Sequence, residues 1–63
     1  MSKPELLDFE VSLINETDNS WLIRALEGKK VWVPRSLCEM VEGRRNKWTL
    51  TIPAWLAEEK GLI

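Results

Sequence analysis

The stretch from Lys47 to Leu62, KWTLTIPAWLAEEKGL, decides the fold because a strand pattern runs directly into a helix pattern. Its first six residues alternate polar and apolar side chains, which is typical of a strand with one buried face. Pro53 suits the first turn of a helix, where its missing amide hydrogen is not needed. Gly61 suits the left-handed position that ends a helix. The stretch therefore predicts a strand over residues 47–52 and a short helix from Pro53.

The predicted helix is about two turns long, and a helix this short is not stable alone in water. It must therefore dock against the strands. Its apolar side chains are Trp55, Leu56 and Leu62, with Leu62 expected to fold back onto Leu56 beyond the glycine. We expect these residues to form the docking surface of the helix.

The rest of the chain shows short strands separated by turn residues. Apolar and polar residues alternate most clearly over Phe9–Leu13. Further strands are expected at Trp21–Leu26, Lys30–Val33 and Glu39–Glu42. Turns are expected at Asn15–Ser20, Glu27–Lys29 (with Gly28 at positive φ), Arg35–Cys38 (a single helical turn) and Gly43–Asn46. The sequence therefore predicts a mainly β fold: about five short antiparallel strands in a small SH3-like or OB-like curled sheet or barrel, with a short C-terminal helix.

A length of 63 residues and a hydrophobic content of 44% predict one small globular domain over residues 1–63, with residues 1–7 as a loose lead-in. Chains this short bury little surface, so stability needs dense packing or association. Four tryptophans supply large apolar areas for a core. There is no basic start followed by a long apolar run, and Cys38 is the only cysteine. We therefore expect a reducing, cytoplasmic location without membrane contact.

The composition gives no support to an enzyme. The chain has no histidine, the commonest general base and metal ligand, and no pair of cysteines at metal-binding spacing. Its three glycines stand far apart, so there is no glycine-rich phosphate loop. Without a histidine partner, Cys38 is expected to be a small buried apolar residue and not a nucleophile. We expect a non-catalytic domain with no metal, no cofactor and no small-molecule substrate.

The first hypothesis for function is contact with another protein or with a second copy of the chain. The strand at Trp21–Leu26 carries apolar side chains on both faces. Either the helix covers the second face, or that face makes an external contact through an exposed aromatic residue. A homodimer would use a two-fold contact. The candidate contact residues are Trp21, Ile23 and Trp32.

The second hypothesis is weak, sequence-independent contact with nucleic acid. The net charge is only −1, but residues 29–48 hold six bases and two acids. In this hypothesis Trp32 or Trp48 stacks on a nucleobase beside these cations. The alternative is a solvated loop with Trp48 in the core, which its strand face shared with Leu50 and Ile52 favours. The candidate residues are Lys29, Lys30, Arg35, Arg44, Arg45 and Lys47.

Three pieces of the sequence also carry a resemblance to a known family. They are Glu16-Thr17 followed by Trp21-Leu22-Ile23, then WVPRS at residues 32–36, then IPAWLAEEKGL at residues 52–62. Together they resemble a family of short, uncharacterised proteins from phages and prophages of proteobacteria. The resemblance implies a phage or prophage origin and a role near DNA metabolism or host interaction, and it carries no catalytic residue. Separately, Val33–Ser36 is similar to the proline-and-turn step late in SH3 domains, without their acidic loop and aromatic groove.

Overall fold

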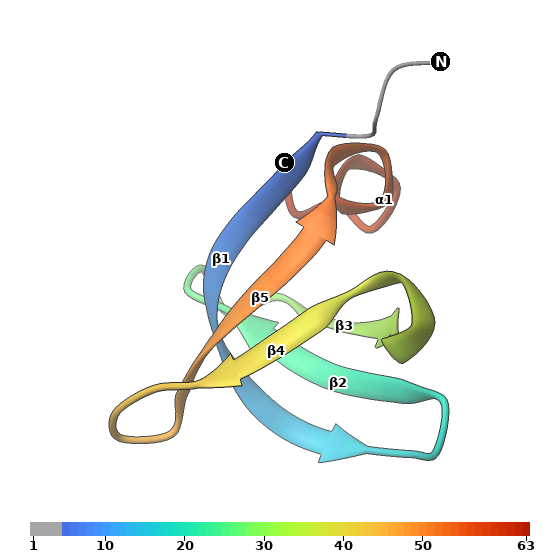
Figure 1. Cartoon of the computed structure of the whole chain (residues 1–63). Helices are drawn as coiled ribbons and strands as arrows, with labels where there is room; N and C mark the ends of the chain where they lie inside the picture. The colour runs from blue at the N-terminus through green and yellow to red at the C-terminus, as the bar shows by residue number, and fades with distance from the viewer. Residues whose placement is uncertain (1–4) are drawn as a thin grey trace.

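The computed structural model describes residues 5–63, which form five strands, one turn of 3-10 helix and one α-helix (Figure 1). The mainly β prediction is confirmed, as is the short C-terminal helix. In the turn between the second and third strands, Gly28 has a φ of 97°, as predicted. The bounds are β1 Leu6–Glu16, β2 Ser20–Ala25, β3 Lys30–Pro34, the 3-10 turn η1 Arg35–Leu37, β4 Glu39–Glu42, β5 Lys47–Pro53 and α1 Ala54–Glu59.

The strands form one antiparallel sheet in the order β3-β2-β1-β5-β4, so β1 is the central strand. The edge strands β3 and β4 do not pair with each other, and the sheet neither closes nor curls strongly. The predicted SH3-like or OB-like curled sheet or barrel is wrong in this respect. Closure requires the two edges to meet in a fixed register. Here the edges have only five and four residues, which leaves few positions at which they could pair.

The central strand β1 is long enough to serve two neighbours. Its residues Leu6–Ser12 pair with β5, and its residues Val11–Glu16 pair with β2. The predicted lead-in was therefore too long, because Leu7 is already in the sheet opposite Ile52. The rest of that prediction, on residues 1–4, lies outside the described residues.

Alternate residues of each strand point to opposite sides of the sheet, and one side, the inner face, holds the hydrophobic core. Ile23 and Leu50 have no exposed surface there. Trp21 and Trp48 are half-buried and pack against this core, and for Trp48 this is the position that its strand face predicted. The buried core residues are Val11, Ile23, Val33, Cys38, Leu50, Ile52, Leu56 and Ala57.

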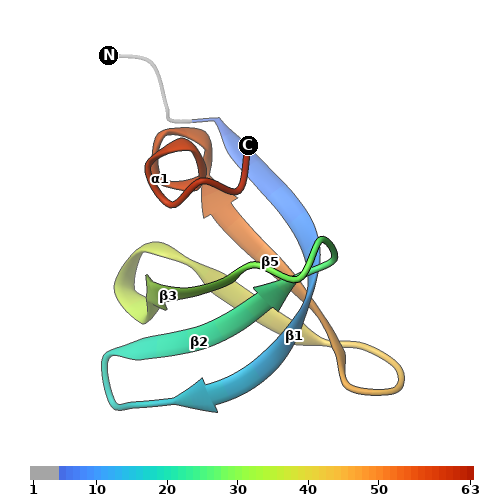
Figure 2. The ribbon, with the colours of Figure 1, turned by 180° about the vertical axis from the view of Figure 1, so that it is seen from behind.

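The helix α1 lies at one end of the sheet, against β1 and β5 (Figure 2). Leu56 and Ala57 are buried, but Trp55 is 51% exposed, so the prediction that Trp55 docks is wrong. Successive helical residues are about 100° apart, so a face centred between Leu56 and Ala57 turns Trp55 away from the sheet. Beyond the helix, Gly61 has a φ of 77°, and the Leu62 N–H donates to the Ala57 carbonyl at 2.8 Å. This is the predicted left-handed cap, and it folds Leu62 onto the core.

Candidate functional site

The side of the sheet opposite the core, the outer face, carries a line of basic residues. Lys30 of β3 pairs with Arg24 of β2, Arg24 pairs with Ser12 of β1, and Ser12 pairs with Lys47 of β5. Because directly paired residues point to the same side of a sheet, these side chains form one line across four strands. Neighbouring strands are about 4.8 Å apart, so the line extends over about 14 Å. We call the exposed residues Arg24, Lys30 and Lys47 the cationic row.

The β4–β5 loop continues the cationic row at its β5 end. Arg44 and Arg45 are both exposed and come just before Lys47. The Lys47 N–H donates to the Arg44 carbonyl at 2.9 Å, which closes the predicted hairpin loop. Arg45 and Asn46 have φ values of 53° and 65°. Asparagine tolerates this left-handed geometry, whereas other side chains there cost about 1–2 kcal/mol. Arg45 therefore adopts a strained conformation, with its charge exposed beside Lys47.

A hollow of about 360 Å³ opens where the cationic row meets this loop. Its wall includes Arg44, Arg45, Lys47, Trp48 and Glu10. Lys47 Nζ donates to Glu10 Oε2 at 3.5 Å, and both side chains remain about half exposed. An exposed ion pair of this kind contributes little to stability. Lys47 can therefore exchange Glu10 for an anionic ligand.

Acidic residues occupy the other end of the outer face. Asp8 of β1, Thr51 of β5 and Glu39 of β4 form a second cross-strand line, in which Thr51 Oγ1 donates to Asp8 Oδ1 at 2.6 Å. Asp8 is four residues from Ser12 along β1, a distance of about 13 Å. The net charge of the chain is only −1, but the outer face of the sheet has one basic end and one acidic end.

Of the residues predicted to contact a protein, Trp32 is the one on the outer face. It pairs with Leu22 and is 42% exposed. Ile23 is completely buried in the core, so it offers no surface to a partner. Trp21 packs against the core, and the guanidinium carbon of Arg35 lies 5.0 Å from its ring centroid. Association of the chain with itself or with another protein stays a prediction.

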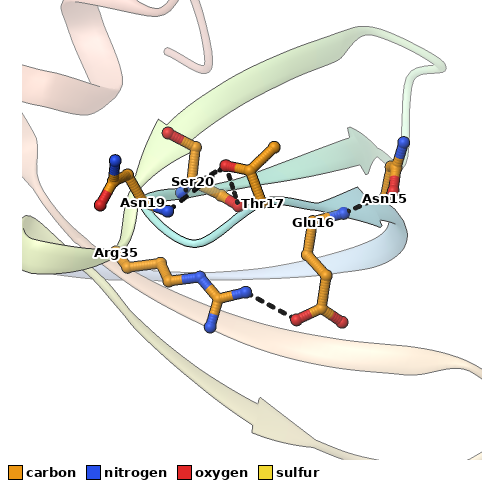
Figure 3. A network of polar contacts seen from close by, with 6 residues as sticks. All are labelled: Asn15, Glu16, Thr17, Asn19, Ser20 and Arg35. Carbon is orange, nitrogen blue, oxygen red and sulfur yellow. Dashed lines mark hydrogen bonds and ion pairs between the residues drawn. The ribbon is translucent and has the colours of Figure 1, made fainter.

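Two of the predicted nucleic-acid residues, Arg35 and Lys29, hold turns together away from the cationic row. Arg35 Nη2 donates to Glu16 Oε1 at 2.6 Å (Figure 3). The Arg35 backbone N–H donates to the Asn19 carbonyl at 2.9 Å. Lys29 Nζ donates to the Gly61 carbonyl at 3.4 Å. Neither residue takes part in the strand pairs that place Lys30 and Lys47 on the outer face.

The β1–β2 turn that Arg35 contacts is also held by its own side chains (Figure 3). Thr17 Oγ1 accepts hydrogen bonds from the Ser20 N–H at 3.0 Å and from the Asn19 N–H at 3.4 Å. Such bonds from short polar side chains to the backbone are the reason that these residues favour turns. The turn predicted over Asn15–Ser20 is shorter in the structure, because Asn15 and Glu16 belong to β1 and Ser20 begins β2.

Arg24 belongs to the cationic row but was not predicted from the sequence. It lies outside residues 29–48, where the basic residues are concentrated along the chain. Pairing of β2 with β3 across the Gly28 turn brings Arg24 opposite Lys30. The signal that identifies Arg24 is therefore strand register, which charge density along the chain does not contain.

Cys38 is buried, as predicted. Burial raises the pKa of its thiol above the ordinary value of 9.0, and the nearby charge of Lys60 opposes this only in part. A protonated thiol at neutral pH is a poor nucleophile. Over residues 5–63, no group of three or more His, Cys, Asp or Glu side chains is placed to hold a metal ion. None of the helices in this range has the length and apolar character needed to cross a membrane.

Comparison with known proteins adds no relative to this description. No family model, no curated protein and no solved structure matches the chain. The resemblance to phage and prophage proteins therefore stays a prediction, and the outer face supplies the evidence on function.

Proposed function

We propose that this domain binds nucleic acid, without catalysis, through the outer face of its sheet. The observation that carries the proposal is the strand register that aligns Lys30, Arg24 and Lys47 over about 14 Å. Basic side chains spaced along a surface neutralise phosphates and release their counterions. Arg44 and Arg45 add two cations at one end of the row. Binding is expected to be weak, independent of base sequence and sensitive to salt.

Contact with a protein, the alternative, has less support from the geometry. Of its candidate residues, Trp32 alone is exposed. The open edge of β3 that carries Trp32 begins at Lys30 and ends at Pro34. A lysine and a proline on an edge strand both discourage pairing with a further strand. Leu26 lies in the β2–β3 turn and Val41 on the opposite edge strand, so neither enlarges the apolar area around Trp32 and Leu22, to which Ile14 of β1 adds one exposed side chain. Nucleic acid is therefore the better-supported ligand.

Charge reversal of two adjacent lysines tests the proposal. Lys30 belongs to the cationic row, whereas Lys29 contacts Gly61 near the end of the chain. Lys30→Glu and Lys29→Glu change the net charge equally, so a general electrostatic effect would weaken binding in both. We expect Lys30→Glu to lower the affinity for a short labelled oligonucleotide by about tenfold, and Arg24→Glu/Lys30→Glu to lower it further. We expect Lys29→Glu to change it little. Fluorescence anisotropy at about 50 mM and about 200 mM salt measures these affinities.

Thermal melting followed by circular dichroism is the folding control for these variants, because the substituted side chains are exposed and lie outside the core. A wild-type chain that binds no oligonucleotide at low salt would contradict the proposal. Equal losses of affinity in Lys30→Glu and Lys29→Glu would also contradict it, since net charge and not the row would then control binding.

A further inference from the structure

We infer that the ligand of the outer face is a single strand and that one of its bases stacks on Trp32; this inference rests on the nucleic-acid function proposed above. Trp32 is two residues from Lys30 on β3, so both side chains point to the same side. Alternate residues of a strand are about 6.8 Å apart. A base resting on the Trp32 indole therefore has its own phosphate close to Lys30 and Arg24.

The surroundings of Trp32 suit stacking better than those of the other tryptophans. Trp21 and Trp48 pack against the core, and Trp55 is exposed on α1 at the end of the sheet. Trp32 is 42% exposed, and Leu22, its partner on β2, is half-buried next to it. An indole supported by a neighbour keeps its orientation and still presents aromatic area to solvent. Stacking of a base requires both properties.

The width of the outer face disfavours a duplex. The major groove of B-DNA is about 12 Å wide and admits a helix or a two-stranded ribbon. The cationic row alone extends over about 14 Å and four strands, so this face does not fit into the groove. On the outside of a duplex, the row would contact phosphates while the paired bases stayed hidden from Trp32. An unpaired base exposes the flat surface that an aromatic side chain can cover.

The number of cations predicts how binding depends on salt. For single strands, the slope of log K against log salt concentration is about −0.7 for each phosphate contact. The three cations of the row give a slope of about −2, and engagement of Arg44 and Arg45 makes it about −3.5. We expect the steeper slope for the wild type and the shallower slope for Arg44→Ala/Arg45→Ala. A wild-type slope near zero would contradict phosphate contact by the row.

Competition between a short single strand and a duplex of equal length tests the inference directly. We expect the wild type to bind the single strand about tenfold more tightly than the duplex. Trp32→Leu should weaken single-strand binding about tenfold, the effect of losing one stacked base, and leave duplex binding unchanged. Trp32→Phe keeps an aromatic face and should retain most of the affinity. Trp55→Leu, which removes an exposed tryptophan away from the row, is the matched control.

A second measurement does not depend on the folding of Trp32→Leu. Stacking on a base quenches indole fluorescence, so the single strand should quench the emission of the wild type and quench that of Trp32→Phe much less. Equal affinity for single strand and duplex, with the same quenching in both proteins, would overturn the stacking inference and leave the cationic row standing. Undiminished binding of both nucleic acids by Arg24→Glu/Lys30→Glu would show that the cationic row is not the binding surface. Absence of binding of either nucleic acid by the wild type at low salt would overturn the nucleic-acid function itself.

Discussion

The inner and outer faces of the sheet are made by the same strands but obey different physical constraints. On β2, Ile23 has no exposed surface, while its neighbour Arg24 is exposed and aligned with the cations of two other strands. The inner face is fixed by close packing, in which lost volume is costly. On the outer face, strand register determines which side chains lie next to one another, and these exposed side chains can be changed at little cost in stability. Alternate residues of one β-strand can therefore contribute to stability and to binding. Substitutions on the inner face should change the free energy of unfolding, and substitutions on the outer face should change the affinity for the ligand.

The largest expected effect is on the inner face. Leu50→Ala removes a completely buried side chain and should lower the free energy of unfolding by about 3 kcal/mol, as for other leucines truncated in cores. Leu6→Ala, at a position that is 61% exposed on β1, is the matched control and should change it by less than about 0.5 kcal/mol. Urea denaturation measures both. Equal losses at the two positions would remove the distinction between the faces.

Arg35 tests whether a cation outside the row affects stability alone. Arg35→Ala removes the contact with the Trp21 ring and the ion pair with Glu16. The side chains of this ion pair are partly exposed, Arg35 by 34% and Glu16 by 56%. Such contacts are weak near water, so the free energy of unfolding should fall by about 1 kcal/mol. The Arg35 Nε is buried without a hydrogen-bond partner among residues 5–63, which also limits the loss. Affinity for an oligonucleotide should stay close to that of the wild type. A loss of affinity as large as that expected for Lys30→Glu would show that Arg35 is part of the binding surface.

Arg45→Gly should change stability and binding in opposite directions. Glycine adopts the left-handed conformation of Arg45 without strain, which stabilises the folded state. Glycine also gives the unfolded chain more conformational entropy, which offsets part of this gain. The free energy of unfolding should therefore rise by about 0.5 kcal/mol. The same change removes a cation beside the row and should weaken binding. Asn46→Gly is the control because its φ is also positive and its charge is zero. Destabilisation by Arg45→Gly would show that contacts of the arginine side chain hold the loop.

The smallest expected effect is a pH dependence of stability from Cys38. Burial raises the pKa of its thiol in the folded state, so the unfolded chain loses the thiol proton first as the pH rises. The buried thiol therefore makes its full contribution to the free energy of unfolding below about pH 9, the ordinary pKa. That contribution is lost as the pH rises through the folded-state pKa. Urea denaturation at neutral pH and above pH 9 measures the prediction. The free energy of unfolding should fall more between these two pH values for the wild type than for Cys38→Ala. Equal losses would contradict the raised pKa.

The parts of the fold that could be predicted from the sequence depend on neighbouring residues. The strand Glu39–Glu42 was predicted with its observed bounds, because the predicted turns Arg35–Cys38 and Gly43–Asn46 bound it on both sides. The inward position of Trp48 followed from the alternation along its strand. In both cases a few adjacent positions contain the whole signal.

The parts that could not be predicted depend on packing between distant segments. The openness of the sheet is decided by whether β3 and β4 meet, and no local pattern encodes that. The exposure of Trp55 depends on which side of a short helix meets β1 and β5. The membership of Arg24 in the cationic row depends on the register of β2 with β3. Of the predicted nucleic-acid residues, strand pairing puts Lys30 and Lys47 in the row, whereas Lys29, which precedes β3, contacts the Gly61 carbonyl.

The long central strand also has a consequence for the order of folding. β1, β2 and β3 follow one another as a meander, and β4 and β5 form a hairpin, so each part contains only short-range pairings. The pairing of Leu6–Ser12 with β5 joins residues 35 to 47 positions apart. Loop-closure entropy makes such long-range pairing slow, so we expect the meander and the hairpin to form first and to join last. Lys47 is on one part, and Arg24 and Lys30 are on the other. The cationic row therefore exists only after the two parts have joined, and a ligand bound across it would hold them together and raise the unfolding temperature.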